Sequence, residues 1–247
     1  MTEAYKRIAI ITGTTSGFGE ATMRKFVAAG FGVVGNGRNA AKLAELEHDI
    51  GAALCSVAGD AADTTVVEKL FAKAEERFGR QADIVVANAG RGLDGSVKDA
   101  DLSQFEDVLK INVRGALALI QKAARQMVAR QQTAFPQSAA DIVLIGSVVG
   151  RHISPFSAVY GATKFAVHAL AEGLRRDVAS SGVRVSLVEP GAILTGFQAG
   201  AGYGEEMLTL FKEKFGPLPS ADDVANAVTH IVTQPPHVHI SDIVVRP

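Results

Sequence analysis

The chain has 247 residues, of which 47% are hydrophobic and 21% are charged, and this balance excludes a disordered chain, a collagen and a coiled coil. Its 25 basic and 26 acidic residues leave a formal net charge of -1, which argues against a dedicated nucleic-acid-binding protein with a basic face. A length of this size is compatible with one α/β domain, so we expect a single unit over residues 1–247.

The single cysteine, Cys55, excludes a disulfide within the chain, and its apolar neighbours predict a buried thiol rather than a nucleophile. The histidines do not cluster with it at metal-ligand spacing, so we expect no metal site. The N-terminus lacks the apolar core of a signal peptide, and no apolar run is long enough to span a bilayer. We therefore expect a cytoplasmic protein that binds neither membrane nor nucleic acid.

Short runs rich in Val and Ile alternate with helical patterns along the whole chain. The runs are nearly continuous, as in strands covered on both faces, and lie at residues 7–12, 32–36, 53–57, 84–87, 142–145, 183–188 and 240–245. The helical patterns lie at residues 18–29, 40–50, 64–78, 103–131, 158–180 and 221–233. Because parallel neighbours need crossover connections, this alternation predicts an α/β fold with a doubly wound, seven-stranded parallel sheet flanked by helices.

Two glycines and one irregular segment complete the predicted layout. Gly30 and Gly182 follow the first and fifth helical patterns, where left-handed caps occur. Residues 191–219 contain six glycines and two prolines without a clear periodicity. A long loop in a compact domain is commonly a lid, so we expect a substrate lid at 191–219.

The first predicted strand runs into a glycine-rich turn with the spacing Gly-x3-Gly-x-Gly, formed by Gly13, Gly17 and Gly19. Glycines at this position let the backbone bend sharply, and the amides of the following helix favour a phosphate group. The turn lacks the Gly-Lys-Ser/Thr sequence, which excludes the triphosphate-binding P-loop.

The second strand is followed by Arg38 and Asn39, and no acidic residue lies between Phe31 and Lys42. NAD-binding proteins usually place a carboxylate here for the ribose hydroxyls, whereas a guanidinium matches a 2′-phosphate. The sequence therefore favours NADP(H) over NAD(H). The alternative is that Arg38 is a surface residue at the end of a strand.

Three further segments carry polar side chains, two of them just after strands and one at the start of a helix. The fourth strand is followed by Asn88-Ala89-Gly90, the fifth by Ser147, and the fifth helix begins with Tyr160 and Lys164. The tyrosine and the lysine are four residues apart, so they lie on one helical face.

These motifs, in this order, resemble the classical short-chain dehydrogenases/reductases over essentially the whole chain. The resemblance rests on the turn at 12–19, Asp60, Asn88-Ala89-Gly90, Asn112, Ser147, Tyr160-x3-Lys164 and Pro190-Gly191. It implies a single-domain Rossmann fold and an enzyme that interconverts a secondary alcohol and a ketone with a nicotinamide cofactor.

The resemblance also assigns roles. Tyr160 would be the general acid/base, and the ammonium group of Lys164 would lower the pKa of the phenol from its usual value of about 10. Lys164 would also bind the nicotinamide ribose, Ser147 would hold the substrate oxygen, and Asn112 would anchor a water in a proton relay. The expected cofactor contacts are Gly13, Thr14, Thr15, Ser16, Gly17, Phe18, Gly19, Arg38, Asn39, Asp60, Ala61, Asn88, Ala89, Gly90, Tyr160, Lys164, Pro190, Gly191, Ile193 and Thr195. Asp60 would accept from the adenine amino group; its alternative role is a helix N-cap, for which Asp63 is better placed.

The substrate is less well defined by the sequence. Arg91, Arg151, His152, Gln198 and Tyr203 lie on the loops expected to form the pocket, and polar groups there suit a small 3-hydroxy acid, a serine-like compound or a polyol. The tract 159–188 and the ending 239–247 resemble the serine/3-hydroxy acid dehydrogenases and ribitol-type polyol dehydrogenases. Two alternatives stay open, a 3-oxoacyl-carrier-protein reductase and an NADP(H)-binding sensor without turnover.

The resemblance further implies a homotetramer or homodimer, in which the helices at 103–131 and 158–180 pack against their copies. The second of these helices is apolar over more than one face, which suits two covered surfaces. The alternative is a monomer in which that helix is simply buried.

Overall fold

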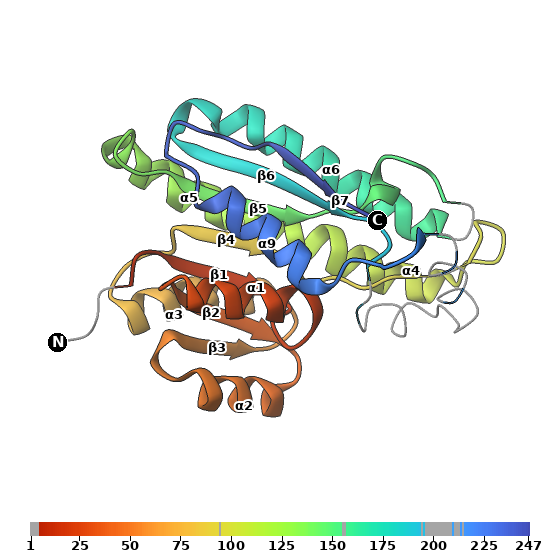
Figure 1. The fold of residues 1–247 in the computed structure, drawn as a ribbon, viewed down its shortest axis with the longest axis horizontal. Helices are drawn as coiled ribbons and strands as arrows, with labels where there is room; N and C mark the ends of the chain where they lie inside the picture. The colour runs from red at the N-terminus through yellow and green to blue at the C-terminus, as the bar shows by residue number, and fades with distance from the viewer. Residues whose placement is uncertain are drawn as a thin grey trace.

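The structure, a computed structural model, describes residues 5–93, 95–154, 157–193, 195, 209, 213 and 215–247. Its centre is one seven-stranded parallel sheet with the strand order β3-β2-β1-β4-β5-β6-β7 (Figure 1). The strands are β1 (Ile8–Thr12), β2 (Gly32–Gly37), β3 (Leu54–Ala58), β4 (Ile84–Ala87), β5 (Ala140–Ile145), β6 (Val183–Pro190) and β7 (Asp242–Val245). This confirms the predicted α/β fold, and the strand ends differ from the predicted ones by at most two residues.

Helices connect the strands and cover both faces of the sheet. They are α1 (Gly17–Ala28), α2 (Ala40–Ile50), α3 (Thr64–Phe78), α4 (Leu102–Leu109), α5 (Ala116–Ala134), α6 (Ala158–Val178) and α9 (Ala221–Val232), with short 3-10 turns at Gly51–Ala53, Val148–Gly150 and Ala179–Ser181. The continuous helix predicted over 103–131 is instead interrupted by a π-helical turn, Lys110–Gly115, between α4 and α5. A π-turn shifts the helical register locally and occurs often at functional sites.

The sheet is packed on two apolar cores because its side chains alternate between the two faces. One core contains Ile8 and Ile10 with apolar residues of α3, α5 and α6. The other contains Ala9 and Ile11 with apolar residues of α1, α2 and α9. Cys55 belongs to the first core and is 6% exposed, which confirms the predicted buried thiol, and burial raises its pKa to about 11.

Local signals in the sequence define several helix ends. The side chains of Asp63 and Asp101 accept backbone N–H groups at the starts of α3 and α4, as N-caps do. Gly30 and Gly182 adopt φ values of 84° and 71°, which confirms the predicted left-handed positions.

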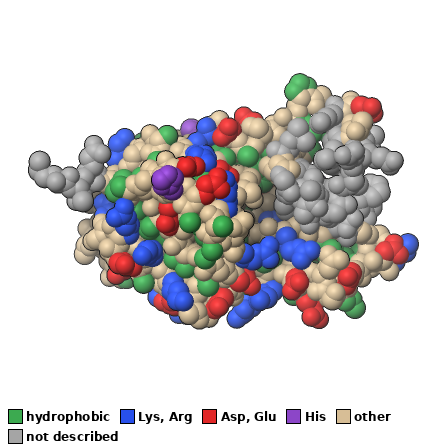
Figure 2. Space-filling view, turned by 90° about the horizontal axis from the view of Figure 1, so that it is seen from below, with side chains coloured by type: hydrophobic (Ala, Val, Ile, Leu, Met, Phe, Trp, Pro, Cys, Tyr) green, Lys and Arg blue, Asp and Glu red, His purple; other side chains and the backbone are tan. Residues whose placement is uncertain are grey.

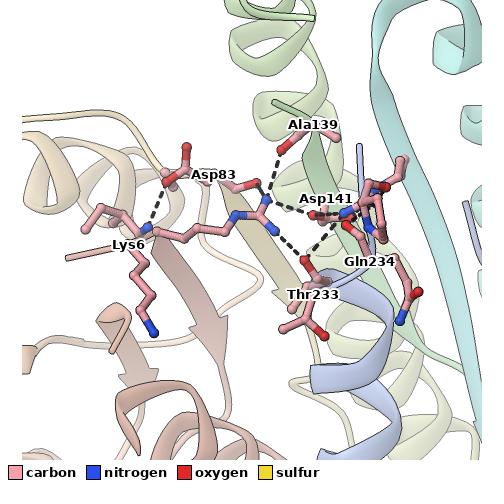
Figure 3. Close-up of polar contacts among 12 residues, drawn as sticks. Lys6, Asp83, Ala139, Asp141, Thr233 and Gln234 are labelled. Atoms are coloured by element: carbon pink, nitrogen blue, oxygen red, sulfur yellow. Dashed lines mark hydrogen bonds and ion pairs between the residues drawn. The ribbon is translucent and has the colours of Figure 1, made fainter. Parts of the chain in front are cut away.

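A buried ion cluster ties the amino edge of the sheet together (Figure 3). The Asp141 carboxylate, which is 0% exposed, accepts two hydrogen bonds from Arg184 at 2.7 and 2.9 Å and lies 2.7 Å from Arg7 Nη2. The guanidinium groups also donate to carbonyl oxygens at and beyond the end of α9, from Arg7 to Val232 at 2.6 Å and from Arg184 to three carbonyls within residues 234–238. All the charges in this cluster are therefore paired and hydrogen-bonded.

Candidate active site

Most of the predicted site residues follow the carboxyl ends of the strands, so the sheet brings them to one edge, at the right in Figure 1. Asn112, Tyr160 and Lys164 instead lie on helical segments. Strand β1 lies between β2 and β4, so the chain changes direction across the sheet at β1. Open α/β sheets bind their ligands at the carboxyl edge beside such a switch point.

At the switch point, hydrogen bonds join the ends of β1 and β4. The Thr12 hydroxyl accepts the amides of Asn88 at 3.2 Å and Ala89 at 3.0 Å. The Asn88 side chain donates in return to the carbonyl oxygens of Thr12 at 2.8 Å and Gly13 at 3.3 Å. Gly90 follows on the surface. Asn88 therefore fixes the glycine-rich turn against β4.

The glycine-rich turn depends on all three of its glycines, and Gly17 has a φ of 56°. Gly13 has a φ of 73°, in the left-handed region, and a Cβ at Gly19 would lie only 2.1 Å from the Gly13 carbonyl oxygen. Ser16 precedes α1 in an extended conformation, and among the described residues its side chain makes no capping hydrogen bond. The first amides of α1 are thus not capped by that side chain, in contrast to those of α3 and α4.

The side chains of the turn hold it against β2. The Thr14 amide donates to the Asn36 carbonyl at 2.8 Å, and the Thr14 side chain is buried. Thr15 lies so close to β2 that a Cβ at Gly37 would be 2.6 Å from its methyl group. Phe18 is half-buried and packs on the core beneath α1. These contacts leave the backbone of the turn facing the carboxyl edge.

Two predicted cofactor-binding residues, Arg38 and Asn39, follow β2. Arg38 is exposed. The Asn39 side chain accepts the Lys42 amide at 3.0 Å and so caps α2. Seen from below, where α2 lies in Figure 1, several Lys and Arg side chains lie together near the middle of the face (Figure 2).

Asp60 lies in the same region, after β3. One of its carboxylate oxygens accepts the Ala62 amide at 2.9 Å, and the other lies 3.0 Å from Lys110 Nζ. The Ala62 hydrogen bond, followed by Lys110 and Arg38, holds the pKa of Asp60 below its usual value. Asp63 caps α3, as predicted, so the Asp60 side chain is not that helix cap. Ala61 is buried beside it.

Tyr160 and Lys164 lie one turn apart on α6, and Lys164 Nζ is 5.8 Å from the centre of the Tyr160 ring. Both are buried, with 6% and 7% of their surfaces exposed. The ammonium group donates to the Ile145 carbonyl oxygen at 2.8 Å, at the end of β5. Ser147 follows two residues later, so α6 brings the tyrosine and the lysine to the strand end that carries the serine.

Burial lowers the pKa of Lys164 from 10.5 to about 8. The cause is desolvation, because a charged amine loses its hydration in the interior. With this pKa most of the amine is charged at neutral pH, and it releases its proton at a lower pH than an exposed lysine does.

Ser147 joins the end of β5 to the end of β6. Its hydroxyl donates to the Pro190 carbonyl oxygen at 3.3 Å and accepts the Val149 amide at 3.4 Å. The Gly191 amide continues the pairing with β7 by donating to Val245 at 2.8 Å.

The chain after Gly191 returns to the glycine-rich turn. Ile193 is buried, and the Cβ of Thr195 lies 3.9 Å from the position of a Cβ at Gly17. The predicted contact residues of the first and last motifs therefore meet at the start of α1.

Asn112 lies in the π-turn, and its side chain is fully hydrogen-bonded to protein. Its oxygen accepts the Arg91 amide at 2.9 Å, and its nitrogen donates to the Arg91 carbonyl at 3.0 Å and to the Thr163 hydroxyl at 3.1 Å. Thr163 in turn donates to the Tyr160 carbonyl at 2.7 Å. Asn112 thus connects the loop after β4 to the first turn of α6, and its role in a water relay remains a prediction.

The predicted pocket residues are placed as follows. Arg91 donates to Gln104 at 3.1 Å, His152 is exposed, and Arg151 forms an ion pair with Glu189. Gln198 and Tyr203 lie outside the described residues, as does most of the segment 191–219. The ring of Tyr160 is in a small apolar cluster with Leu93, Val108, Phe105, Val149 and Val159. The described wall beside the tyrosine is therefore more apolar than the sequence suggested.

Two polar residues behind Ser147 did not emerge from the sequence analysis. The His168 ring accepts the Ser147 amide at 3.3 Å, and the Glu189 carboxylate beside it is 0% exposed. The available signal was the position of Glu189 in the apolar run of β6, where a carboxylate needs a partner.

The described residues offer neither a metal site nor a membrane-spanning helix. None of the groups of His, Cys, Asp and Glu in this part of the chain could hold a metal ion. Likewise, none of the helices described is long and apolar enough to cross a membrane.

Comparisons with known proteins give one family. The family model for short chain dehydrogenases matches residues 7–205. Uncharacterized oxidoreductases of Staphylococcus epidermidis and Staphylococcus aureus are 30% and 31% identical over the full length of both chains. A serine dehydrogenase in complex with NADP+ superimposes with a TM-score of 0.87 at 29% identity, over 97% of this chain and 94% of that one. A 3-ketoacyl-(acyl-carrier-protein) reductase from Brucella melitensis, in complex with NADH, superimposes with a TM-score of 0.88 at 26% identity over 98% of each chain.

Proposed function

Because the chain belongs to the short-chain dehydrogenase family, and is thus an oxidoreductase, we propose that it uses NADP(H) to interconvert a secondary alcohol and a ketone by hydride transfer. The observation that carries the proposal is the buried pair on α6, in which the Lys164 ammonium lies 5.8 Å from the Tyr160 ring next to the end of β5. Burial of a tyrosine and an amine together at the carboxyl edge of the sheet suits proton transfer to an oxygen atom.

The glycine-rich turn fits a dinucleotide. Its glycines allow the tight bend that precedes α1, and the first amides of α1 lack a side-chain cap from Ser16. Free amides at a helix N-terminus attract a phosphate. Residues 13–19 would hold the pyrophosphate, and Lys164 would hold the nicotinamide ribose. When bound, the nicotinamide ring supplies or accepts the hydride.

The chain's own residues handle the proton and the substrate oxygen. Tyr160 would donate its phenolic proton to the oxygen in the reducing direction and accept it in the oxidising direction. The Lys164 ammonium would stabilise the phenolate that this leaves, because opposite charge favours the ionised form. Ser147 would turn its hydroxyl from the Pro190 carbonyl to the substrate oxygen. Asn112 would keep α6 and the loop after β4 in register, through Thr163 and Arg91.

Arg38 supports NADP(H) as the cofactor. It is exposed at the end of β2, and it lies close enough to Asp60 to lower the pKa of that carboxyl. Of the two related structures, the serine dehydrogenase contains NADP+ and the reductase contains NADH, so both cofactors occur among similar folds. A guanidinium here would pair with the 2′-phosphate that only NADP(H) carries.

The Arg38→Asp variant tests this preference. We expect the Kd for NADPH to rise by about tenfold to hundredfold while the Kd for NADH changes little, because a charge-assisted bond is worth roughly 1.5–3 kcal/mol. The control, Arg176→Asp, makes the same charge change on α6, where the side chain is 74% exposed. An unchanged ratio of the two Kd values would show that Arg38 does not select the cofactor.

We propose a small polar substrate, such as a 3-hydroxy acid, a serine-like compound or a polyol. The similarity to serine dehydrogenase supports this class. The second candidate is a 3-oxoacyl-carrier-protein reductase, which the apolar cluster around Tyr160 and the similarity to the Brucella enzyme favour.

Turnover with NADP+ or NADPH on a panel of these alcohols and ketones tests the reaction, with nicotinamide absorbance as the readout. Tyr160→Phe is expected to lose nearly all turnover and to keep its NADPH affinity. Equal loss of turnover and affinity would mean that the tyrosine is structural. Tight NADPH binding by the wild type, without turnover on any substrate class, would contradict the proposal and favour the sensor.

We also propose a homotetramer or homodimer and a substrate lid at 191–219 within one unit spanning the chain. Leu109, Leu117 and Phe165 on α4, α5 and α6 are large apolar side chains with more than two fifths of their surface exposed, 41%, 42% and 43%. These side chains lie on the helices expected to pack against their copies, which supports an interface with a second copy. Light scattering at micromolar concentration measures the mass in solution, and a monomeric mass would contradict the proposed assembly.

A further inference from the structure

His168 is packed tightly behind the end of β5. Its side chain is 14% exposed, and a Cβ at Gly146 or Gly150 would lie 2.5 or 2.4 Å from its Nε2 atom. The same Nε2 lies 3.3 Å from the Ser147 amide nitrogen. The ring therefore occupies space that only glycines leave, and it contacts the backbone of the residue that carries the hydroxyl group.

A buried carboxylate lies on the other side of the ring. Glu189 Oε2 is 3.8 Å from His168 Nδ1, and the carboxylate is paired with Arg151, whose Nη2 donates to Oε1 at 2.6 Å. Arg151 also lies 3.5 Å from Asp242 on β7. The carboxylate is thereby fixed by a cation and cannot turn away from the ring without breaking that pair.

These contacts select one tautomer of His168. The Ser147 amide is a donor, so Nε2 must be the unprotonated acceptor and Nδ1 carries the proton, facing Glu189. Burial holds the pKa of His168 below its usual value of 6.5, with Lys164 and Arg151 acting in the same direction and Glu189 and Asp242 opposing them. The lowered pKa favours the neutral ring, which the hydrogen bond to the amide requires.

We propose that His168, which lies beside Glu189, is a positioning residue: its ring fixes the Ser147 backbone so that the serine hydroxyl faces the substrate oxygen. This inference rests on the proposed function, because it concerns the orientation of Ser147 in that reaction. Protonation of Nε2 removes the acceptor and places an N–H against the N–H of Ser147. Turnover therefore falls as the pH drops below the usual histidine range, while cofactor binding at the glycine-rich turn is retained.

Two variants of His168 separate positioning from packing. His168→Leu keeps the bulk of the side chain and removes the acceptor, and we expect kcat to fall by about tenfold with little change in the Kd for NADPH. His168→Gln places an amide oxygen near the position of Nε2, and we expect it to keep most of the wild-type kcat and to lose the decline at acid pH. Leu170→Ala, a half-buried core residue of the same helix, is the packing control. It is expected to lower stability and leave the pH profile unchanged.

Nuclear magnetic resonance provides a readout that does not depend on turnover. We expect the wild-type ring of His168 to show a protonated Nδ1 and an unprotonated Nε2, and the Ser147 amide signal to shift as the ring titrates. If the wild type turns over none of the substrates, the proposed function fails and these spectra still decide the contact. If the wild type is active but His168→Leu keeps its kcat and its pH profile, or the ring is protonated at Nε2 at pH 7, the positioning role is wrong.

Discussion

Replacing the buried amine of Lys164 tests the physical basis of the site without a substrate. The lysine is 7% exposed, its Nζ is 2.8 Å from the Ile145 carbonyl oxygen, and burial lowers its pKa from 10.5 to about 8. A shift of this size corresponds to about 3 kcal/mol, at 1.36 kcal/mol for each pKa unit. The variant Lys164→Met keeps the length of the side chain and removes the titrating group.

The sign of the pH dependence follows from proton linkage. Between pH 8 and 10.5 the unfolded wild type holds a proton on this amine that the folded protein does not, so the stability of the wild type rises with pH. This stabilisation is complete above 10.5 and is lost as the pH falls through 8. The variant has no amine that titrates here. The free energy of unfolding of the wild type, measured relative to that of Lys164→Met, should therefore rise by about 3 kcal/mol between pH 8 and 10.5.

At pH 7 the amine is charged in both states, and the folded protein bears the unfavourable burial of the ammonium. Removing it recovers about 3 kcal/mol and leaves the Ile145 carbonyl unpaired, at a loss of about 1–3 kcal/mol. We therefore expect Lys164→Met to be at least as stable as the wild type at pH 7 and to have lost turnover.

Urea unfolding followed by far-ultraviolet circular dichroism at pH 7, 8, 9 and 10 measures these differences. The control is Lys98→Met, whose side chain is 82% exposed and loses little hydration on folding, so its difference from the wild type should stay flat. If the curves for Lys164→Met and the wild type run parallel between pH 8 and 10, the amine is hydrated and our explanation of its pKa is refuted.

Two further substitutions test the fold around the site. Asp141→Asn removes the carboxylate that pairs with the buried Arg184 and the partly buried Arg7, and it should reduce the free energy of unfolding by about 3–5 kcal/mol. Asp222→Asn, with a side chain 71% exposed, should change it by less than about 0.5 kcal/mol, and equal urea midpoints would contradict this. Gly19→Ala places a methyl group against a carbonyl oxygen and should abolish NADPH binding in a fluorescence titration. The control is Gly173→Ala, on a helix with nothing within 4 Å of the new methyl group, and it should raise the free energy of unfolding by about 0.5–1 kcal/mol. If Gly19→Ala still binds NADPH, the turn can relax around the methyl group.

The sequence predicted the sheet well because its signals are local. Continuous Val- and Ile-rich runs and the glycines at helix ends act over a few residues, and these placed the strands to within two residues. The π-turn at Lys110–Gly115 was not predicted, since one extra residue in a helical turn barely alters the apolar period.

The surroundings of the site were harder to predict because they depend on pairing across the fold. His168 and Arg151 are polar residues of the kind usually found on a surface. Only the packing of α6 and of the turn after β5 against β6 brings them to Glu189. Asp60 illustrates the same limit, because its pairing with Lys110 joins residues 50 positions apart. Side-chain partners at such separation leave no periodic trace in a sequence.

The ion cluster at the amino edge of the sheet has a consequence for biosynthesis. Arg7, near the first strand, donates to a carbonyl 225 residues later, and the Arg184 guanidinium depends on carbonyls within residues 234–238. Until that segment has emerged from the ribosome, both cations would be buried with only part of their acceptors. We therefore expect the nascent chain to stay loosely packed at this edge until that segment has been synthesised and has emerged.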